Sequence, residues 1–234
     1  MKTKILSVLI IFLSIAIVTG CSGNVNNPDA LKFKQDYESL NGKTINDKKV
    51  RTVKINQNNP LIYKNAEDII TMMDNNESFV VYFGFSKCPW CRSIIETLIK
   101  ASNDLGLDKI YYVDVLNIRD TLSVDKDGNV KEDKKGSNDY YKLLDYFKDV
   151  LSDYKLYDKD GNLVKYDEKR IYAPNVVSVV NGTPTKLTTG ISKKQNDAYM
   201  KLTDKMKKET YNEFKCLIKC VLDSKTTCSK EKEC

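Results

Sequence analysis

Residues 79–91, FVVYFGFSKCPWC, determine the fold of this chain more than any other segment. The first seven of them form a continuous apolar run of strand length, which is typical of a strand covered on both faces of a sheet. Cys88 and Cys91 follow directly, and the next residues carry an apolar stripe of helical spacing at Ile94, Ile95, Leu98 and Ile99. The two cysteines are therefore predicted at the junction where a buried strand ends and a helix begins.

The segments on either side extend this pattern into an α/β arrangement. Residues 110–115, IYYVDV, predict a second strand, so that strand, helix and strand form a βαβ unit with a parallel pair. Upstream, a helix is predicted from Asn65 to about Asn75. Residues 32–40 predict a short helix and residues 50–55 a strand.

Residues 117–172 have the character of an insertion and contain DKDGN twice, at 125–129 and 158–162. A calcium loop would need three ligands before the glycine and a later glutamate, so Asp-Gly turns closing two β-hairpins are favoured. An amphipathic helix is expected between them, with apolar positions Tyr140, Leu143, Leu144, Phe147 and Leu151.

The region after the insertion predicts a hairpin and a long helix. Residues 176–180 and 185–189 have the pattern of two strands joined by a tight turn at Asn181 and Gly182. A final helix is expected from about Ser192, with an apolar stripe interpreted as core packing: Tyr199, Leu202, Met206, Phe214, Leu217 and Val221.

Composition excludes several classes of protein. With 234 residues, 41% hydrophobic and 30% charged, the chain has the profile of one soluble domain with additions. It contains no histidine, which excludes Ser-His-Asp triads, Cys-His hydrolases and histidine-based zinc enzymes. The net charge of +6 comes from interspersed charges, so we expect no nucleic-acid partner.

The N-terminus has the form of a lipoprotein signal. Residues 1–20 carry Lys2 and Lys4 and then an apolar run too short for a typical membrane span, so a retained transmembrane anchor is disfavoured. Residues 18–21, VTGC, resemble the lipobox of bacterial lipoproteins, in which the cysteine, here Cys21, is lipidated. Residues 21–31 are then expected to be a tether on the extracytoplasmic face of the cell membrane, where disulfides can persist.

The spacing of Cys88 and Cys91 favours thiol-disulfide exchange. The unpaired N–H groups and the dipole at a helix N-terminus lower the pKa of a thiol, and Lys87 and Arg92 add positive charge. A mixed disulfide formed by Cys88 could then be resolved by Cys91. Pro89 suits the start of a helix, and Trp90, the only tryptophan, could offer an apolar surface to a peptide substrate.

Other interpretations of this cysteine pair remain open. It could be a purely structural bridge, or half of a zinc site whose remaining ligands would have to come from the distant C-terminal cysteines. A metal carrier that uses Cys88 and Cys91 is a third possibility. We expect no cofactor and no resident metal.

The chain resembles the thioredoxin family over about residues 50–210. VVYFGFSKCPWCR is similar to the family's strand, active-site loop and helix, and Ala173-Pro174 before VVSVVNGTP is similar to its cis-proline, strand and hairpin, ending in Gly190. Among subfamilies, the closest likeness is to bacteriocin transport accessory-type thioredoxin-like lipoproteins. The resemblance implies a central mixed sheet flanked by helices, with an insertion at about 118–172 and a disulfide-rich helical tail.

The resemblance also implies roles for individual residues. Cys88 would be the attacking nucleophile, Cys91 the resolving thiol, and Pro174 a cis-proline beside the sulfurs that exposes backbone, with Ala173, for substrate pairing. One position departs from the family pattern. Thioredoxin has a buried aspartate six residues before its nucleophile, where this chain has Tyr82, so Glu96 or water would have to serve as the base for the resolving thiol.

Four cysteines lie near the C-terminus, at 216, 220, 228 and 234. Cysteines four apart on a helix are too distant for a bond, so Cys216 and Cys220 should each pair with Cys228 or Cys234. We favour Cys220 with Cys228 and Cys216 with Cys234, as structural disulfides. A second redox pair that relays electrons to Cys88 is the alternative.

The sequence thus predicts a membrane-anchored, extracytoplasmic thiol-disulfide oxidoreductase. Its parts would be a signal peptide (1–20), the tether, a thioredoxin-like domain (32–212) and a cysteine-rich extension (213–234). Its partners would be protein or peptide thiols and disulfides and a membrane-bound redox partner, and the protein is expected to be a monomer. The rival hypothesis is a non-catalytic binding lipoprotein in which Cys88 and Cys91 form a fixed bridge.

Overall fold

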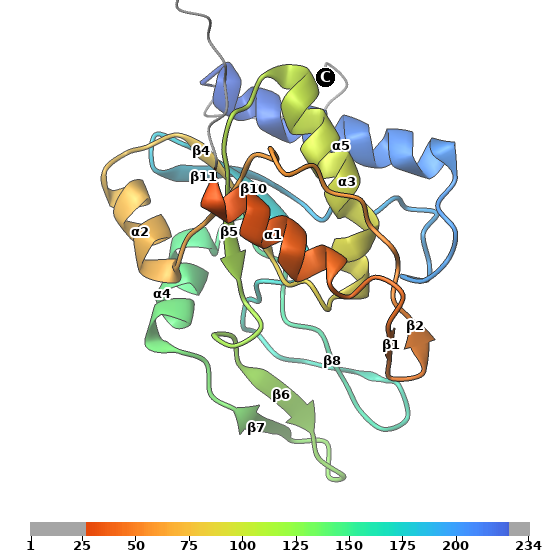
Figure 1. The fold of residues 1–234 in the computed structure, drawn as a ribbon. Coiled ribbons are helices and arrows are strands. Elements are labelled where there is room, and N and C mark those ends of the chain that lie inside the picture. The colour runs from red at the N-terminus through yellow and green to blue at the C-terminus, as the bar shows by residue number, and fades with distance from the viewer. Residues whose placement is uncertain (1–26, 225–234) are drawn as a thin grey trace, which may run out of the picture.

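The computed structural model describes residues 27–224, a mixed α/β fold built on a five-stranded sheet (Figure 1). The strand order is β11-β10-β4-β5-β3. Strands β3 (Leu61–Tyr63), β5 (Ile110–Asp114) and β4 (Phe79–Gly84) run parallel to one another, whereas β10 (Asn175–Val180) and β11 (Thr183–Thr188) continue the sheet antiparallel. The predicted βαβ unit and the later hairpin are confirmed.

Strand β4 lies at the centre of the sheet because all six of its residues are apolar or small enough to be buried. Its side chains alternate between two cores, as the twofold period of a strand requires. Val80 and Tyr82 belong to one core, and Val81 and Phe83 belong to the other. The uninterrupted apolar run therefore contributes side chains to the cores on both faces of the sheet, as predicted.

Helices cover both faces of the sheet. One core packs against α1 (Pro28–Glu38), α3 (Pro89–Leu105) and α5 (Asp204–Leu222), and the other packs against α2 (Ala66–Asp74) and α4 (Asn138–Phe147). Figure 1 shows α3 and α5 side by side on their face of the sheet. The predicted helix at Asn65 begins with a capping box in which the Asn65 and Asp68 side chains each accept a backbone N–H.

The insertion consists of two hairpins and α4. The hairpins are β6 (Thr121–Val124) with β7 (Val130–Lys134) and β8 (Leu156–Tyr157) with β9 (Leu163–Val164). In the first turn the Asp125 carboxylate accepts the backbone N–H groups of Asp127 and Asn129, and Asp158 does the same in the second turn. The carboxylates therefore stabilise hairpin turns, which confirms the hairpin interpretation of both DKDGN segments.

The predicted strand at residues 50–55 is wrong. The segment buries Val50, Val53 and Ile55, but side chains rather than a neighbouring strand take most of its backbone groups. The Asn41 side chain bonds both the N–H and the C=O of Val53, and the Glu38 carboxylate accepts the N–H of Ile55. The edge position of the sheet goes to β3 instead, and a small hairpin, β1 (Thr44–Ile45) with β2 (Lys48–Lys49), precedes the segment.

Two predicted boundaries are also corrected. The last helix begins at Asp204, capped by the Thr203 side chain, rather than near Ser192, and Tyr199, which the sequence places on the apolar stripe, is 40% exposed. At the other end of the chain, residues 28–31 form the first turn of α1 and do not belong to the tether. Within residues 27–224 no helix is both long and apolar enough to cross a membrane.

The signal peptide, the lipidation site at Cys21 and the tail residues Cys228 and Cys234 lie outside the described residues. The predictions made for them therefore stay predictions.

Candidate active site

Cys88 is the N-cap residue of helix α3, and Pro89 occupies the first helical position. Its sulfur accepts a hydrogen bond from the backbone N–H of Cys91, with 3.3 Å between nitrogen and Sγ. As a thiol it donates to the carbonyl oxygen of Ala173, at 3.2 Å. The structure thus brings the end of β4, the start of α3 and the segment that precedes β10 together around one sulfur.

The two cysteines differ in their accessibility. Cys88 keeps 5% of its surface exposed, whereas Cys91 is completely buried one helical turn further on. Of the two residues, only Cys88 therefore has any surface that meets solvent. Cys88 is the outer thiol of the pair and Cys91 is the inner one.

The environments of the two thiols shift their pKa values in opposite directions. The pKa of Cys88 is lowered by a hydrogen bond from the Cys91 side chain, by backbone N–H groups at the start of α3 and by the nearby Arg119, against the opposing effect of burial. The pKa of Cys91 is raised well above that of a free thiol, mainly by burial and further by the interaction with Cys88. Cys88 is therefore the more readily ionised sulfur.

Arg119 is a site residue that the sequence did not reveal. It follows β5, lies half-buried with its guanidinium 5.0 Å from the centre of the Phe85 ring, and is the cation whose charge favours the Cys88 thiolate. It stands at the start of the insertion, where no motif or spacing marks it. Its proximity to Cys88 arises from the pairing of β5 with β4, because Phe85 and Arg119 both follow the carboxyl ends of these parallel strands.

Arg92, predicted to supply charge to Cys88, has a different role. Its guanidinium is 1% exposed and donates to the carbonyl oxygens of Tyr37, Arg51 and Ser86 and to the side-chain oxygen of Asn41. It is directed into the N-terminal segment rather than toward the cysteine sulfur. The prediction that Arg92 places positive charge near Cys88 is therefore wrong, and Arg119 is the arginine that has this role.

The predicted substrate-contacting residues surround Cys88. The Ala173–Pro174 peptide bond is cis; Pro174 is buried, like the strand that follows it, and Ala173 is half-exposed. Pro89 and Trp90 are also half-exposed, and Trp90 packs on the edge of the core that contains both cysteines.

Tyr82 occupies the position beneath the pair and is completely buried. Its hydroxyl is 2.8 Å from that of Tyr37, on α1, and acts to lower the pKa of Cys91, against the larger effect of burial. Glu96, the carboxylate suggested by the sequence as a base, is exposed and accepts the backbone N–H of Lys54. The group next to the Cys91 thiol is therefore the Tyr82 hydroxyl and not the Glu96 carboxylate.

Two of the four C-terminal cysteines belong to the described residues. Cys216 and Cys220 lie on α5, and Cys220 is disulfide-bonded. The predicted partners, Cys228 and Cys234, lie outside the described residues, so the connectivity stays a prediction.

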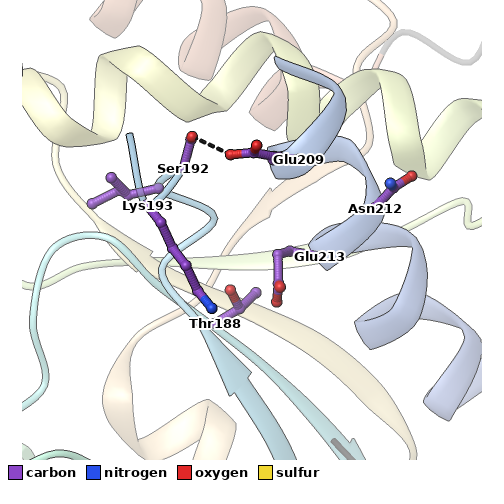
Figure 2. A pocket seen from close by; sticks show the side chains of 7 residues that line it. Thr188, Ser192, Lys193, Glu209, Asn212 and Glu213 are labelled. Atoms are coloured by element: carbon purple, nitrogen blue, oxygen red, sulfur yellow. Dashed lines mark hydrogen bonds between the residues drawn. The ribbon is translucent and has the colours of Figure 1, made fainter. Parts of the chain in front are cut away.

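A surface pocket of about 520 Å³ lies between the segment after β11 and helix α5 (Figure 2). Figure 2 shows the Ser192 hydroxyl directed at the Glu209 carboxylate, to which it donates a hydrogen bond. Lys193 and Glu213 contribute opposite charges to the lining. Because neither Cys88 nor Cys91 lines it, the pocket is not part of the candidate site.

Within residues 27–224 no group of three or more Cys, Asp or Glu side chains is arranged to hold a metal ion. Comparison of the chain with protein-family models, with curated proteins and with solved structures found no match. The functional assignment therefore depends on the geometry of Cys88 and its neighbours.

Proposed function

We propose that the protein is a thiol-disulfide oxidoreductase on a thioredoxin-like scaffold, with Cys88 as its nucleophile. The observation that carries this proposal is the asymmetry between two sulfurs at one helix N-terminus. Cys88 retains some exposure and its pKa is lowered, whereas Cys91 is completely buried and its pKa is raised. A fixed structural bridge would need neither difference.

The arrangement supports a two-step exchange. The Cys88 thiolate attacks one sulfur of a substrate disulfide, and the other substrate sulfur leaves with the electron pair and is protonated by solvent. Cys91 then loses its proton and attacks Cys88, which forms the Cys88–Cys91 disulfide and releases the second substrate thiol. The substrate disulfide is reduced and the cysteine pair is oxidised, and the reverse sequence oxidises a dithiol.

The neighbouring groups have matching roles in this scheme. The Ala173 carbonyl, which already accepts a hydrogen bond from the Cys88 thiol, would bind the substrate backbone. The half-exposed Trp90 would bind an apolar side chain of the substrate. Arg119 would add its charge to the hydrogen bonds that favour the Cys88 thiolate. The scaffold proposal is supported by the parallel strands β3, β5 and β4, followed by the antiparallel hairpin of β10 and β11 after Pro174.

The predicted lipid anchor at Cys21 would keep this domain on the extracytoplasmic face of the cell membrane. The substrates would then be secreted proteins or peptides, and a membrane-bound redox partner would restore the starting state of the cysteines. A monomer suffices for every step, because the described site is formed within one chain.

The test is the reduction of insulin by dithiothreitol in the presence of residues 22–234. We expect the protein to accelerate the precipitation of reduced insulin and expect Cys88→Ser to abolish this acceleration. A Tyr140→Phe variant serves as the control, because Tyr140 lies on α4, in the core on the other face of the sheet from both cysteines. If the unaltered protein gives no acceleration, the binding lipoprotein becomes the better account, and metal analysis of the purified protein then examines the carrier alternative.

A further inference from the structure

Two buried tyrosine hydroxyls lie in the core that contains the resolving cysteine. Tyr82 projects from β4 into the core that contains Cys91, and Tyr37 projects into the same core from α1. Both side chains are completely buried, and their hydroxyl oxygens are 2.8 Å apart. The Tyr82 hydroxyl also lies next to the Cys91 thiol and acts to lower its pKa, against the larger effect of burial. The Cys91 thiol and the two phenolic hydroxyls therefore form one buried cluster.

The position of the Tyr82 hydroxyl is fixed by its surroundings. It fills the space beside Gly84, where an added Cβ would come within 2.5 Å of the hydroxyl oxygen. The Tyr112 ring lies 5.3 Å from the Tyr82 ring, centre to centre. Because the core leaves little other room for this hydroxyl, its contact with Cys91 is held in place before any substrate arrives.

A buried phenol acts on a thiol differently from a carboxylate. Burial raises the pKa of Tyr82 well above 10, so the hydroxyl keeps its proton throughout the neutral range. It therefore serves as a hydrogen-bond donor and not as a base. A donor directed at a sulfur in a dry site stabilises the negative charge that develops when that sulfur ionises.

We propose that the Tyr82 hydroxyl is a further catalytic group, which donates a hydrogen bond to Cys91 while this thiol attacks the mixed disulfide, and that Tyr37 is the residue that positions it. This inference rests on the proposed function of the same cysteine pair. Cys91 gives its proton to water and its electron pair forms the bond to Cys88. The bond between Cys88 and the substrate breaks, and the substrate sulfur leaves with its electron pair and is protonated by solvent.

The two steps of exchange then become separable. The first attack uses the Cys88 thiolate, whose pKa is lowered by Cys91, by backbone N–H groups and by Arg119, without a contribution from Tyr82. The second attack uses Cys91, which Tyr82 contacts directly. Loss of the Tyr82 hydroxyl should therefore slow only the second step.

The experiment follows a single turnover of reduced residues 22–234 with a disulfide-bonded peptide. Acid quenching and mass spectrometry count the mixed disulfide at Cys88 as it forms and as it is resolved. In Tyr82→Phe we expect formation at the unaltered rate and resolution slowed at least about tenfold, the effect of one lost hydrogen bond to a charged group. Tyr37→Phe, which keeps the Tyr82 hydroxyl, should slow resolution by a smaller factor.

Tyr140→Phe is the matched control. Tyr140 is also a completely buried tyrosine, but it lies on α4 in the core on the other face of the sheet. Its substitution should leave both steps unchanged. If Tyr82→Phe does not fold, the Tyr37→Phe variant becomes the test of the inference. An unchanged rate of resolution in that variant would then overturn it.

The possible outcomes separate the inference from the proposed function. If the unaltered protein forms no mixed disulfide at Cys88, the oxidoreductase proposal fails. If the mixed disulfide forms, but Tyr82→Phe resolves it within twofold of the unaltered rate, only the role of Tyr82 fails. Equal slowing of both steps would indicate a packing role and would also reject the inference.

Discussion

Cys88 lies in an environment that lowers the free energy of its thiolate from several sides. The Cys91 side chain, the backbone N–H groups that open α3 and the Arg119 guanidinium all act on the same sulfur. Partial burial opposes them by disfavouring charge. The hydrogen bonds come with the helix N-terminus, whereas the guanidinium comes from a distant loop and can be removed without altering α3.

We therefore expect Arg119→Gln to raise the pKa of Cys88. Less thiolate would be present at neutral pH, so the alkylation of reduced Cys88 by iodoacetamide should slow there and recover at higher pH. Lys126→Gln is the control, because Lys126 is an exposed cation of the same insertion, in the turn between β6 and β7. The midpoint of the alkylation rate against pH checks the effect, and a midpoint that does not move would remove Arg119 from the site.

Each element contributes one part of the site, and the insertion contributes Arg119. The adjacent Asp120 forms a buried salt bridge with Arg170, with 2.5 Å between carboxylate oxygen and guanidinium nitrogen. Arg170 also lies over the Tyr154 ring, 3.9 Å from its centre. This pair joins the first and last parts of the insertion next to the loop that carries Arg119.

Asp120→Ala should accordingly destabilise the protein more than removal of an exposed acid. It leaves the Arg170 guanidinium buried without its anion, a loss of about 3 to 5 kcal/mol in the free energy of unfolding. Asp153→Ala breaks the exposed pair with Lys169 in the same insertion and should change stability little. Urea denaturation of the unaltered protein and both variants measures the difference. Similar stabilities for the two variants would show that the buried pair does not hold the insertion.

Across the whole molecule, the sequence predicts those features that local pattern determines. The unbroken apolar run of β4, the cysteines after it and the stripe of α3 indicate the place of the candidate site through spacing alone. The two hairpin turns of the insertion are predictable for the same reason, because Asp125 and Asp158 act within five residues of chain. These features depend on neighbours in the sequence.

Features that depend on distant contacts escape prediction. Residues 50–55 have a strand pattern, but the side chains of Asn41 and Glu38 take the backbone groups that a strand would pair. The predicted start of α5 is too early, because Leu202 and Tyr199 have helical spacing although Thr203 caps the helix after them. Arg119 and the contact between the Tyr37 and Tyr82 hydroxyls join segments far apart in the chain, so no spacing rule indicates them.

The oxidoreductase proposal requires that the Cys88 sulfur is ionised and reachable while the Cys91 sulfur is neither. The decisive measurement is the alkylation rate of each cysteine of the reduced protein at pH 7, resolved by mass spectrometry and compared with that of free glutathione. We expect Cys88 to react faster than glutathione and Cys91 to react far more slowly than Cys88. Equal rates at the two cysteines, or a Cys88 slower than glutathione, would contradict the proposal.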